Sequence, residues 1–173
     1  MSDPELFAEY GLFWDIENED FVRSLSEEIA TAPMEGKLGV QGRGGESSAK
    51  EEHEPENWKT QCLAIGDGLE MIRARLQQDT RWRLLFWMNR TPETAAISAH
   101  RHGGEWAGLI YAALPEDPAP LVFVREDGSE FARVDAKAGR AILWPSEWIH
   151  RVEARPSSHP GVRLALVCNA FRA

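Results

Sequence analysis

The feature that most constrains this chain is the change in hydrophobic period after residue 80. Trp82, Leu84, Phe86 and Met88 recur at every second position, which is the period of a β-strand. Short apolar segments separated by turn residues then continue to the C-terminus. The predicted strands span 81–89, 94–100, 106–113, 120–125, 130–135, 139–145, 148–154 and 162–171. Eight short strands of this kind predict a closed or sandwiched antiparallel barrel.

Two helices are predicted before the strands. Asn18 offers an N-cap, and apolar residues recur at helical spacing from Phe21 until Pro33 ends the pattern. The stretch 60–78 has the clearest helical period, carried by Cys62, Ile65, Leu69, Ile72 and Leu76. One apolar face on each helix indicates packing against the outside of the barrel. The predicted fold class is therefore α+β, mainly β.

The stretch 34–57, between the two predicted helices, is rich in Gly, Ser, Glu and Lys and has little apolar surface to bury. A connection of this length is either disordered or a lid that orders over a ligand. We expect one domain over 1–173, with 1–80 as an N-terminal helical support and 81–173 as the barrel core.

Composition excludes several classes of function. The formal net charge of -9 and the isoelectric point near 5.1 argue against nucleic acid or an anionic membrane surface as a partner, because both need clustered Lys and Arg. No apolar run is long enough to cross a membrane, and the N-terminus has no secretory signal pattern. We therefore expect a cytoplasmic protein in which Cys62 and Cys168 are core residues rather than a disulfide.

Three histidines form the strongest candidate site. His100 and His102 end an alternating segment, so on a continuous strand both rings would project from the same face. His150 follows an apolar strand and the Pro145-Ser146 turn. Three neutral imidazoles that converge from two strands would suit a borderline divalent metal such as Zn, Fe, Cu or Ni.

Two family resemblances bear on these residues. The spacing Gly139-x5-Pro145-x-Glu147-x2-His150 departs by one residue from the second motif of the cupins. From Trp87 to Phe171 the chain resembles, more specifically, the small bacterial and phage Fe(II)/2-oxoglutarate-dependent oxygenases related to prolyl hydroxylases. The segments that carry this resemblance are 87–90, 100–102, 107–115, 120–123, 138–146, 150–152 and 163–171. Both resemblances imply a double-stranded β-helix, that is, a jelly-roll or cupin-like barrel.

The oxygenase resemblance also implies roles for individual residues. His150 matches the distal metal ligand, and Arg163 matches the basic residue that pairs with the far carboxylate of 2-oxoglutarate. Tyr111 matches an aromatic residue whose hydroxyl can donate to the same carboxylate. A guanidinium suits a carboxylate because it offers a bidentate and permanently charged fork. An exposed Arg at a strand start and a core Tyr are the alternative interpretations of these two residues.

The first ligand motif departs from the family pattern, His-x-Asp/Glu, because His102 stands at the acidic position. Three ligand sets remain possible. The first, which we favour, is His100, His102 and His150; the second is His102 and His150 with Glu105. In the third, His102 and His150 act alone and Gly104 leaves a position empty, as in the halogenating branch of this superfamily.

The resemblance implies an iron oxygenase with Fe(II) as cofactor and 2-oxoglutarate as co-substrate, acting on a small molecule, an amino acid or a peptide. A cupin-type dioxygenase or isomerase without 2-oxoglutarate, and a non-enzymatic metal- or ligand-binding barrel, are the alternatives. Monomer and homodimer both remain possible. Trp106, Trp144 and Trp148 could shape a substrate pocket or simply pack in the barrel. Arg90 and Arg101 could favour an anionic substrate, with surface charge as the simpler interpretation, and Arg140 and Asn169 could bridge strands.

Overall fold

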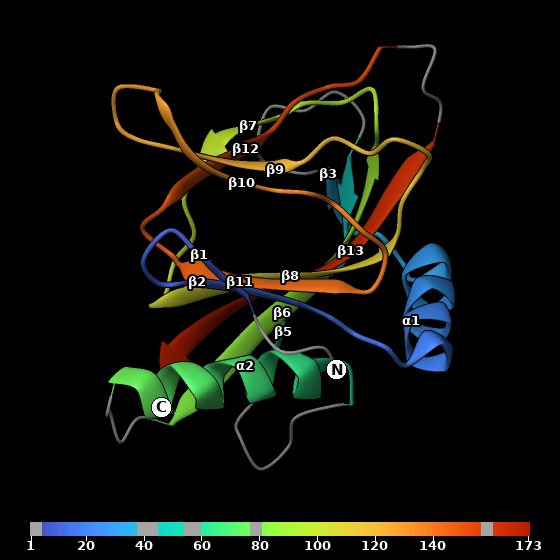
Figure 1. The fold of residues 1–173 in the computed structure, drawn as a ribbon. Helices are drawn as coiled ribbons and strands as arrows, with labels where there is room; N and C mark the ends of the chain where they lie inside the picture. The colour runs from blue at the N-terminus through green and yellow to red at the C-terminus, as the bar shows by residue number, and fades with distance from the viewer. Residues whose placement is uncertain (1–4, 38–44, 54–59, 77–80, 157–160) are drawn as a thin grey trace.

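A computed structural model describes residues 5–37, 45–53, 60–76, 81–156 and 161–173 (Figure 1). It contains helices α1 (Glu19–Thr31) and α2 (Thr60–Leu76). Five strands come from the N-terminal part: β1 (Glu5–Phe7), β2 (Gly11–Asp15), β3 (Gly36–Lys37), β4 (Glu46–Ser47) and β5 (Glu51–His53). The C-terminal part supplies β6 (Trp82–Pro92), β7 (Ile97–His100), β8 (Trp106–Ala113), β9 (Leu121–Val124), β10 (Glu130–Val134), β11 (Arg140–Pro145), β12 (Ile149–Val152) and β13 (Val162–Arg172).

The strands form two antiparallel sheets that face each other (Figure 1). The larger sheet runs in the order β1-β2-β11-β8-β13-β6-β4-β3, with β5 also paired to β6, and the smaller runs β10-β9-β12-β7. Strands β6, β8, β11 and β13 thus belong to one sheet and β7, β9, β10 and β12 to the other. This distribution confirms the predicted double-stranded β-helix.

Apolar side chains fill both faces of the larger sheet. Between the sheets, Phe123, Ile142 and Trp144 are completely buried in one cluster. On the opposite face, Ile29 of α1 and Leu69 of α2 are also completely buried, in a second cluster with residues of β2, β6, β8, β11 and β13. The two helices therefore cover the outside of the barrel, as their apolar periodicity predicts.

The helix boundaries follow local sequence signals. The Asn18 side chain accepts a hydrogen bond from the backbone N–H of Phe21 at 3.0 Å, which confirms the predicted N-cap. Helix α2 ends at Leu76, and the remainder of the predicted helix 60–78 lies outside the described residues. No helix in the described part of the chain is long and apolar enough to cross a membrane.

For the stretch 34–57 the sequence predicts either a disordered connection or a lid, and the structure shows short strands in part of it. Its described residues include β3, β4 and β5, and both β4 and β5 pair with β6. The N–H and C=O groups along β6 provide hydrogen bonds that need no apolar side chain, so polar residues can extend the sheet here. Residues 38–44 and 54–57 lie outside the described residues.

The N-terminal strands extend the other end of the same sheet. Strand β2 pairs with β11, and the Arg140 Nε atom lies 2.8 Å from the Asp15 carboxylate across this pair. Lys137 adds a second contact to Asp15 at 2.6 Å. Arg140 therefore bridges two strands, which agrees with the simpler interpretation of this residue.

Candidate metal centre

A cavity of about 340 Å³ lies between the two sheets. Its walls include apolar side chains from both sheets, among them Trp87, Ile97, Leu109, Leu121, Trp144, Val152, Ala165 and Val167. The polar residues that line it are Ser47, Lys50, Asn89, Thr91, His100, Arg101, His102, Tyr111, His150, Arg163 and Asn169. A mostly apolar cavity with a few polar groups on its walls is the usual form of a small-ligand site.

Strand pairing places two of the histidines together. His100 on β7 and His150 on β12 are directly opposite each other in the antiparallel register, and their ring centroids lie 4.3 Å apart. Cross-strand partners on one face of a sheet lie close enough for their side chains to interact. The register of β7 and β12 alone therefore sets this pair.

His102 reaches the same point from a loop rather than from a strand. Strand β7 ends at His100, so the extended segment needed to place both rings by strand period does not continue to His102. The His102 backbone N–H instead donates to the Ser146 carbonyl at 3.2 Å, and the Ser146 hydroxyl donates to the Gly103 carbonyl at 3.1 Å. This docking against the turn after β11 brings the His102 ring to 4.9 Å from the His150 ring.

Hydrogen bonds to the backbone fix the rings. His100 Nδ1 lies 2.8 Å from the Ser98 carbonyl oxygen, and His150 Nδ1 lies 3.2 Å from the Trp148 carbonyl oxygen. A carbonyl oxygen can only accept, so Nδ1 carries the proton in both residues and Nε2 keeps its lone pair. This arrangement is typical of metal-binding histidines.

The three side chains can hold one metal ion. One ligand nitrogen from each ring lies within 4.8 Å of the other two, and His102 Nε2 and His150 Nε2 are 3.2 Å apart. One of these two nitrogens can donate a hydrogen bond to the other when no ion is bound, and the same close approach of ligand nitrogens fits a divalent ion between them. Imidazole nitrogen suits Fe, Zn, Cu and Ni, so the donor set does not select among these metals.

Burial keeps these imidazoles neutral. It lowers the pKa of His102 to about 4, with smaller contributions from the nearby His100 and Lys50. Burial is also the main cause that lowers the pKa of His100, and it lowers that of His150 well below its ordinary value, assisted there by the other two rings. Neutral imidazole is the form that binds metals, so all three are ready to coordinate at neutral pH.

Glu105, the carboxylate of the second predicted ligand set, does not join the cluster. Its carboxylate pairs instead with Arg172 at 2.5 Å and is more than one-third exposed. Gly104, just before it, has a φ of +86° and would place a Cβ 2.5 Å from the Ala170 carbonyl oxygen. The chain turns here in a conformation that favours glycine, and this turn directs Glu105 away from the imidazoles.

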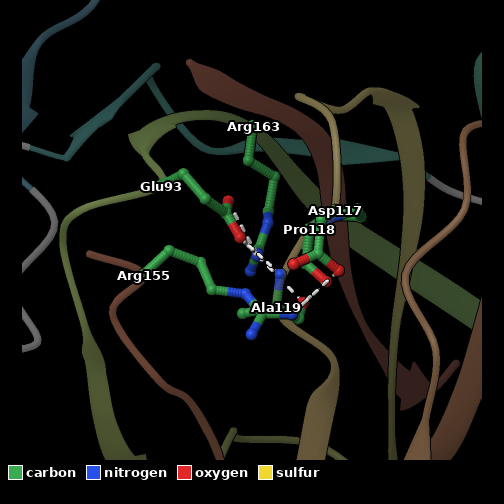
Figure 2. Close-up of polar contacts among 6 residues, drawn as sticks. All are labelled: Glu93, Asp117, Pro118, Ala119, Arg155 and Arg163. Atoms are coloured by element: carbon green, nitrogen blue, oxygen red, sulfur yellow. Dashed lines mark hydrogen bonds and ion pairs between the residues drawn. The ribbon is translucent and has the colours of Figure 1, made fainter. Parts of the chain in front are cut away.

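Arg163 lines the cavity but already has a carboxylate partner inside the protein. Its Nη2 atom lies 2.9 Å from both oxygens of Glu93 and donates to the Ala119 carbonyl at 3.0 Å (Figure 2). Both side chains are almost completely buried, with 5% and 1% exposed. The interpretation of Arg163 as an exposed residue at a strand start is therefore wrong. Glu93 was not predicted, because it lies in a turn after Pro92 with no pattern around it.

Tyr111 lies next to this ion pair. The Arg163 guanidinium is 5.7 Å from the Tyr111 ring centroid, and the Tyr111 side chain is 1% exposed. Burial raises the pKa of the Tyr111 hydroxyl, which therefore remains a hydrogen-bond donor. The Tyr111 hydroxyl and Arg163 Nε are both buried without a hydrogen-bond partner among the described residues. Buried polar atoms of this kind indicate a missing ligand or water.

Other lining residues had no specific predicted role. The Asn169 side chain lies beside His102 and opposes the lowering of its pKa. Lys50 contributes its ammonium group 4.8 Å from the Trp87 ring centroid. Both reach the cavity through pairing of distant segments, which the spacing of single residues does not reveal.

Of the tryptophans and arginines near the histidines in the sequence, some line the cavity and others lie away from it. Trp144 lines the cavity and is fully buried, whereas Trp106 packs in the cluster beneath the helices. Arg101 lines the cavity and pairs with Glu126. Arg90 pairs with Glu46 and donates to the Ala30 carbonyl, so it connects secondary-structure elements rather than facing a ligand.

No protein-family model matches the sequence, and no curated protein matches it. Solved structures do match the fold. A prolyl-4-hydroxylase from Pseudomonas putida has a TM-score of 0.66 at 20% identity, over 95% of this chain and 93% of that one. A viral collagen prolyl hydroxylase from Paramecium bursaria Chlorella virus-1, solved with 2-oxoglutarate, has a TM-score of 0.67 at 12% identity, over 96% and 97%. A prolyl hydroxylase from Trichoplax adhaerens, solved with a hypoxia inducible factor peptide, has a TM-score of 0.57 at 14% identity, over 92% and 83%.

These neighbours define the fold class. The chain has the double-stranded β-helix fold of prolyl hydroxylases and other 2-oxoglutarate-dependent Fe(II) oxygenases. At such low identity the likeness shows the fold alone, because one fold hosts many reactions. The function has to be argued from the site.

Proposed function

We propose that this protein is an Fe(II)/2-oxoglutarate-dependent oxygenase that hydroxylates a small molecule, an amino acid or a peptide. One observation carries the proposal. A cluster of three neutral imidazoles, His100, His102 and His150, shares a cavity with two unpartnered buried donors, the Tyr111 hydroxyl and Arg163 Nε. A metal-chelating 2-oxo acid with a distal carboxylate needs both kinds of group in one cavity.

In this proposal each group of residues in the cavity has its own role. The imidazoles of His100, His102 and His150 would hold the metal ion. Tyr111 and Arg163 donate to the distal carboxylate and so orient the co-substrate. Trp87, Trp144 and Val167 surround the site with apolar surface, which limits access of water to the reacting groups. When bound, Fe(II) would activate dioxygen; oxidation of 2-oxoglutarate to succinate and carbon dioxide would supply two of the four electrons that dioxygen takes up, and hydroxylation of the substrate carbon atom would supply the other two.

A peptide substrate has one specific support. One structural neighbour is a prolyl hydroxylase solved with a peptide fragment. The cavity in this chain reaches Ser47 and Lys50, so the segment that follows β4 forms part of its wall. A substrate that approaches the metal would contact this segment.

A cupin-type dioxygenase or isomerase that uses the metal without a 2-oxo acid is the second candidate. It is favoured by the three-histidine donor set, which lacks the acidic ligand of most 2-oxoglutarate oxygenases. The Glu93 carboxylate also favours this second candidate, because it already pairs with Arg163, the residue that would bind the distal carboxylate of a 2-oxo acid.

Anaerobic titration separates the two candidates. We expect Fe(II) followed by 2-oxoglutarate to produce the weak visible charge-transfer band of a chelated 2-oxo acid. His150→Ala should abolish the band, because it removes one of the proposed metal ligands. Metal binding that raises the melting temperature, with no band and no further response to 2-oxoglutarate, would reject the 2-oxoglutarate oxygenase in favour of the second candidate.

A further inference from the structure

The ion pair between Arg163 and Glu93 closes the end of the cavity near Tyr111, and the inference drawn from it rests on the proposed function. Arg163 lines the cavity, whereas Glu93 is not among the described residues that line it. Glu93 therefore contacts the guanidinium from the side away from the cavity, and Arg163 Nε has no hydrogen-bond partner among the described residues. A ligand carboxylate would be the second carboxylate bound to the same guanidinium.

Glu93 cannot easily move away from this position. Its backbone N–H donates to the Gly161 carbonyl at 3.0 Å, and its own carbonyl accepts from the Arg155 N–H at 2.9 Å. The Ala119 N–H donates to Glu93 Oε1, next to the contacts with Arg163 (Figure 2). Three separate segments thus fix Glu93: two hold its backbone and the third holds its carboxylate next to the guanidinium.

A second guanidinium lies near this ion pair and is itself engaged in contacts among the described residues. Arg155, the nearest other guanidinium in Figure 2, contacts the Pro118 carbonyl at 3.2 Å and the Asp117 carboxylate at 3.4 Å. The charges of Arg163 and Glu93 cancel, so this end of the cavity is close to neutral. The distal carboxylate of a dicarboxylate ligand would add an uncompensated buried negative charge, which is unfavourable.

We propose that Glu93 determines co-substrate selectivity, by weakening the preference of this cavity for a dicarboxylate 2-oxo acid over one with an uncharged tail. The side chain acts through Arg163 and does not touch the co-substrate. The Tyr111 hydroxyl and Arg163 Nε can still donate hydrogen bonds to a polar distal group, but the Coulomb attraction of a free guanidinium is lost. The cavity therefore tolerates 2-oxo acids that a free arginine would reject.

Glu93→Gln tests the charge alone. Glutamine keeps the shape of the side chain and an oxygen that can accept from the Ala119 N–H, but it leaves the Arg163 charge available. Two unit charges a few ångströms apart interact strongly in a partly buried site, so we expect 2-oxoglutarate to bind at least about tenfold tighter. Affinity for 2-oxopentanoate, which has the same chain length without the distal carboxylate, should stay within about twofold, because its tail carries no charge.

Binding is measured anaerobically by calorimetry on the Ni(II)-loaded protein, so turnover is not needed. Glu130→Gln is the matched control, because it removes the same charge from a surface pair with Arg133. Its affinities for both 2-oxo acids should equal those of the wild type. Equal or weaker binding of 2-oxoglutarate by Glu93→Gln would overturn the inference and make Glu93 a residue that only positions Arg163.

The wild type offers a second measurement if Glu93→Gln does not fold. It should prefer 2-oxoglutarate over 2-oxopentanoate by less than about tenfold, because the remaining hydrogen bonds are offset by repulsion from Glu93. A much larger preference would overturn the inference while leaving the proposed function intact. Failure of the metal-loaded wild type to bind either 2-oxo acid would overturn both.

Discussion

His100 and His150 are directly opposed residues of the antiparallel strands β7 and β12, with ring centroids 4.3 Å apart. Neither ring needs a long or flexible connection to reach the other. The third ring, of His102, depends on a loop that docks on Ser146. The candidate metal centre thus combines a rigid pair with a ligand whose position depends on local turn geometry.

Removal of any one imidazole should remove most of the metal affinity. We expect His102→Ala and His150→Ala to weaken Ni(II) or Fe(II) binding more than about 100-fold, because loss of a direct ligand exceeds the effect of losing its supporting contact. Calorimetric titration under anaerobic conditions measures this, with one metal ion per chain expected in the wild type. Glu105→Gln is the control, since Glu105 pairs with Arg172. If Glu105→Gln weakens binding as much as the histidine variants, the ligand set with Glu105 is correct.

Gly104→Ala should destabilise the protein and the metal site together. The residue has a φ of +86°, and an added Cβ would lie 2.5 Å from the Ala170 carbonyl oxygen. We expect a loss of at least about 3 kcal/mol, part from the left-handed backbone and part from the clash.

Chemical denaturation measures the Gly104→Ala effect, and Gly128→Ala provides a matched comparison. Gly128 has a nearly equal φ of +82° but no atom within 4 Å of the added Cβ. That variant should lose only about 1 kcal/mol. Equal losses in the two variants would show that the contact with Ala170 has no effect.

Tyr111→Phe should weaken the binding of 2-oxoglutarate without lowering the stability of the ligand-free protein. The hydroxyl is buried without a partner among the described residues, so its removal should leave the stability of the ligand-free protein unchanged or raise it by about 1 kcal/mol. Affinity for 2-oxoglutarate should fall about fivefold to tenfold through loss of one charge-assisted hydrogen bond. Thermal melts with and without 2-oxoglutarate measure both effects. The exposed Tyr10 gives a control variant, Tyr10→Phe, and a loss of stability without loss of affinity in Tyr111→Phe would contradict its proposed role.

The metal-free protein should lose stability on mild acidification. The folded-state pKa of His102 is about 4, below its ordinary value of 6.5, and those of His100 and His150 are lowered as well. As the pH falls through 6.5 the unfolded chain takes up protons that the folded chain does not. The slope should reach at most about 1.4 kcal/mol per pH unit for each histidine. Above pH 6.5 the same groups should have no effect, because they are neutral in both states.

Urea denaturation in the presence of a chelator, between pH 7.5 and 4.5, measures this slope. His102→Asn should reduce it, because one of the three groups is removed. The Asp15 and Glu130 carboxyls, whose pKa values are lowered from 3.8 and 4.5, add to the loss only near the acid end of this range, so the slope is read above about pH 5.5. A stability that stays constant over this range would contradict the assigned neutral state.

Much of the architecture could be predicted from local patterns. The alternation from Trp82 to Met88 predicts a strand, and β6 extends three residues further only because it pairs with β13 along its whole length. The Asn18 cap and Pro33 bracket α1 to within two residues of its observed end at Thr31. Strands β4 and β5 were not predicted, because their polar residues join the sheet through backbone hydrogen bonds that no hydrophobic period records.

The candidate site was predicted only in part, because some of its contacts join residues that are far apart in the chain. The resemblance to oxygenases indicated His150, Arg163 and Tyr111, and the structure places all three on one cavity. It did not indicate that Arg163 binds Glu93, which is 70 residues away in the chain. It also could not exclude Glu105, because the left-handed turn at Gly104 depends on contact with Ala170.

By itself the sequence determined the order of helices and strands and the residue types available for a metal site, because period, caps and turns act between near neighbours. Only the tertiary structure decided which polar groups meet. Strand register sets His100 against His150, and three distant segments bring the Glu93 carboxylate to Arg163. Such contacts depend on the closure of the barrel, so their chemistry appears only when the chain is folded.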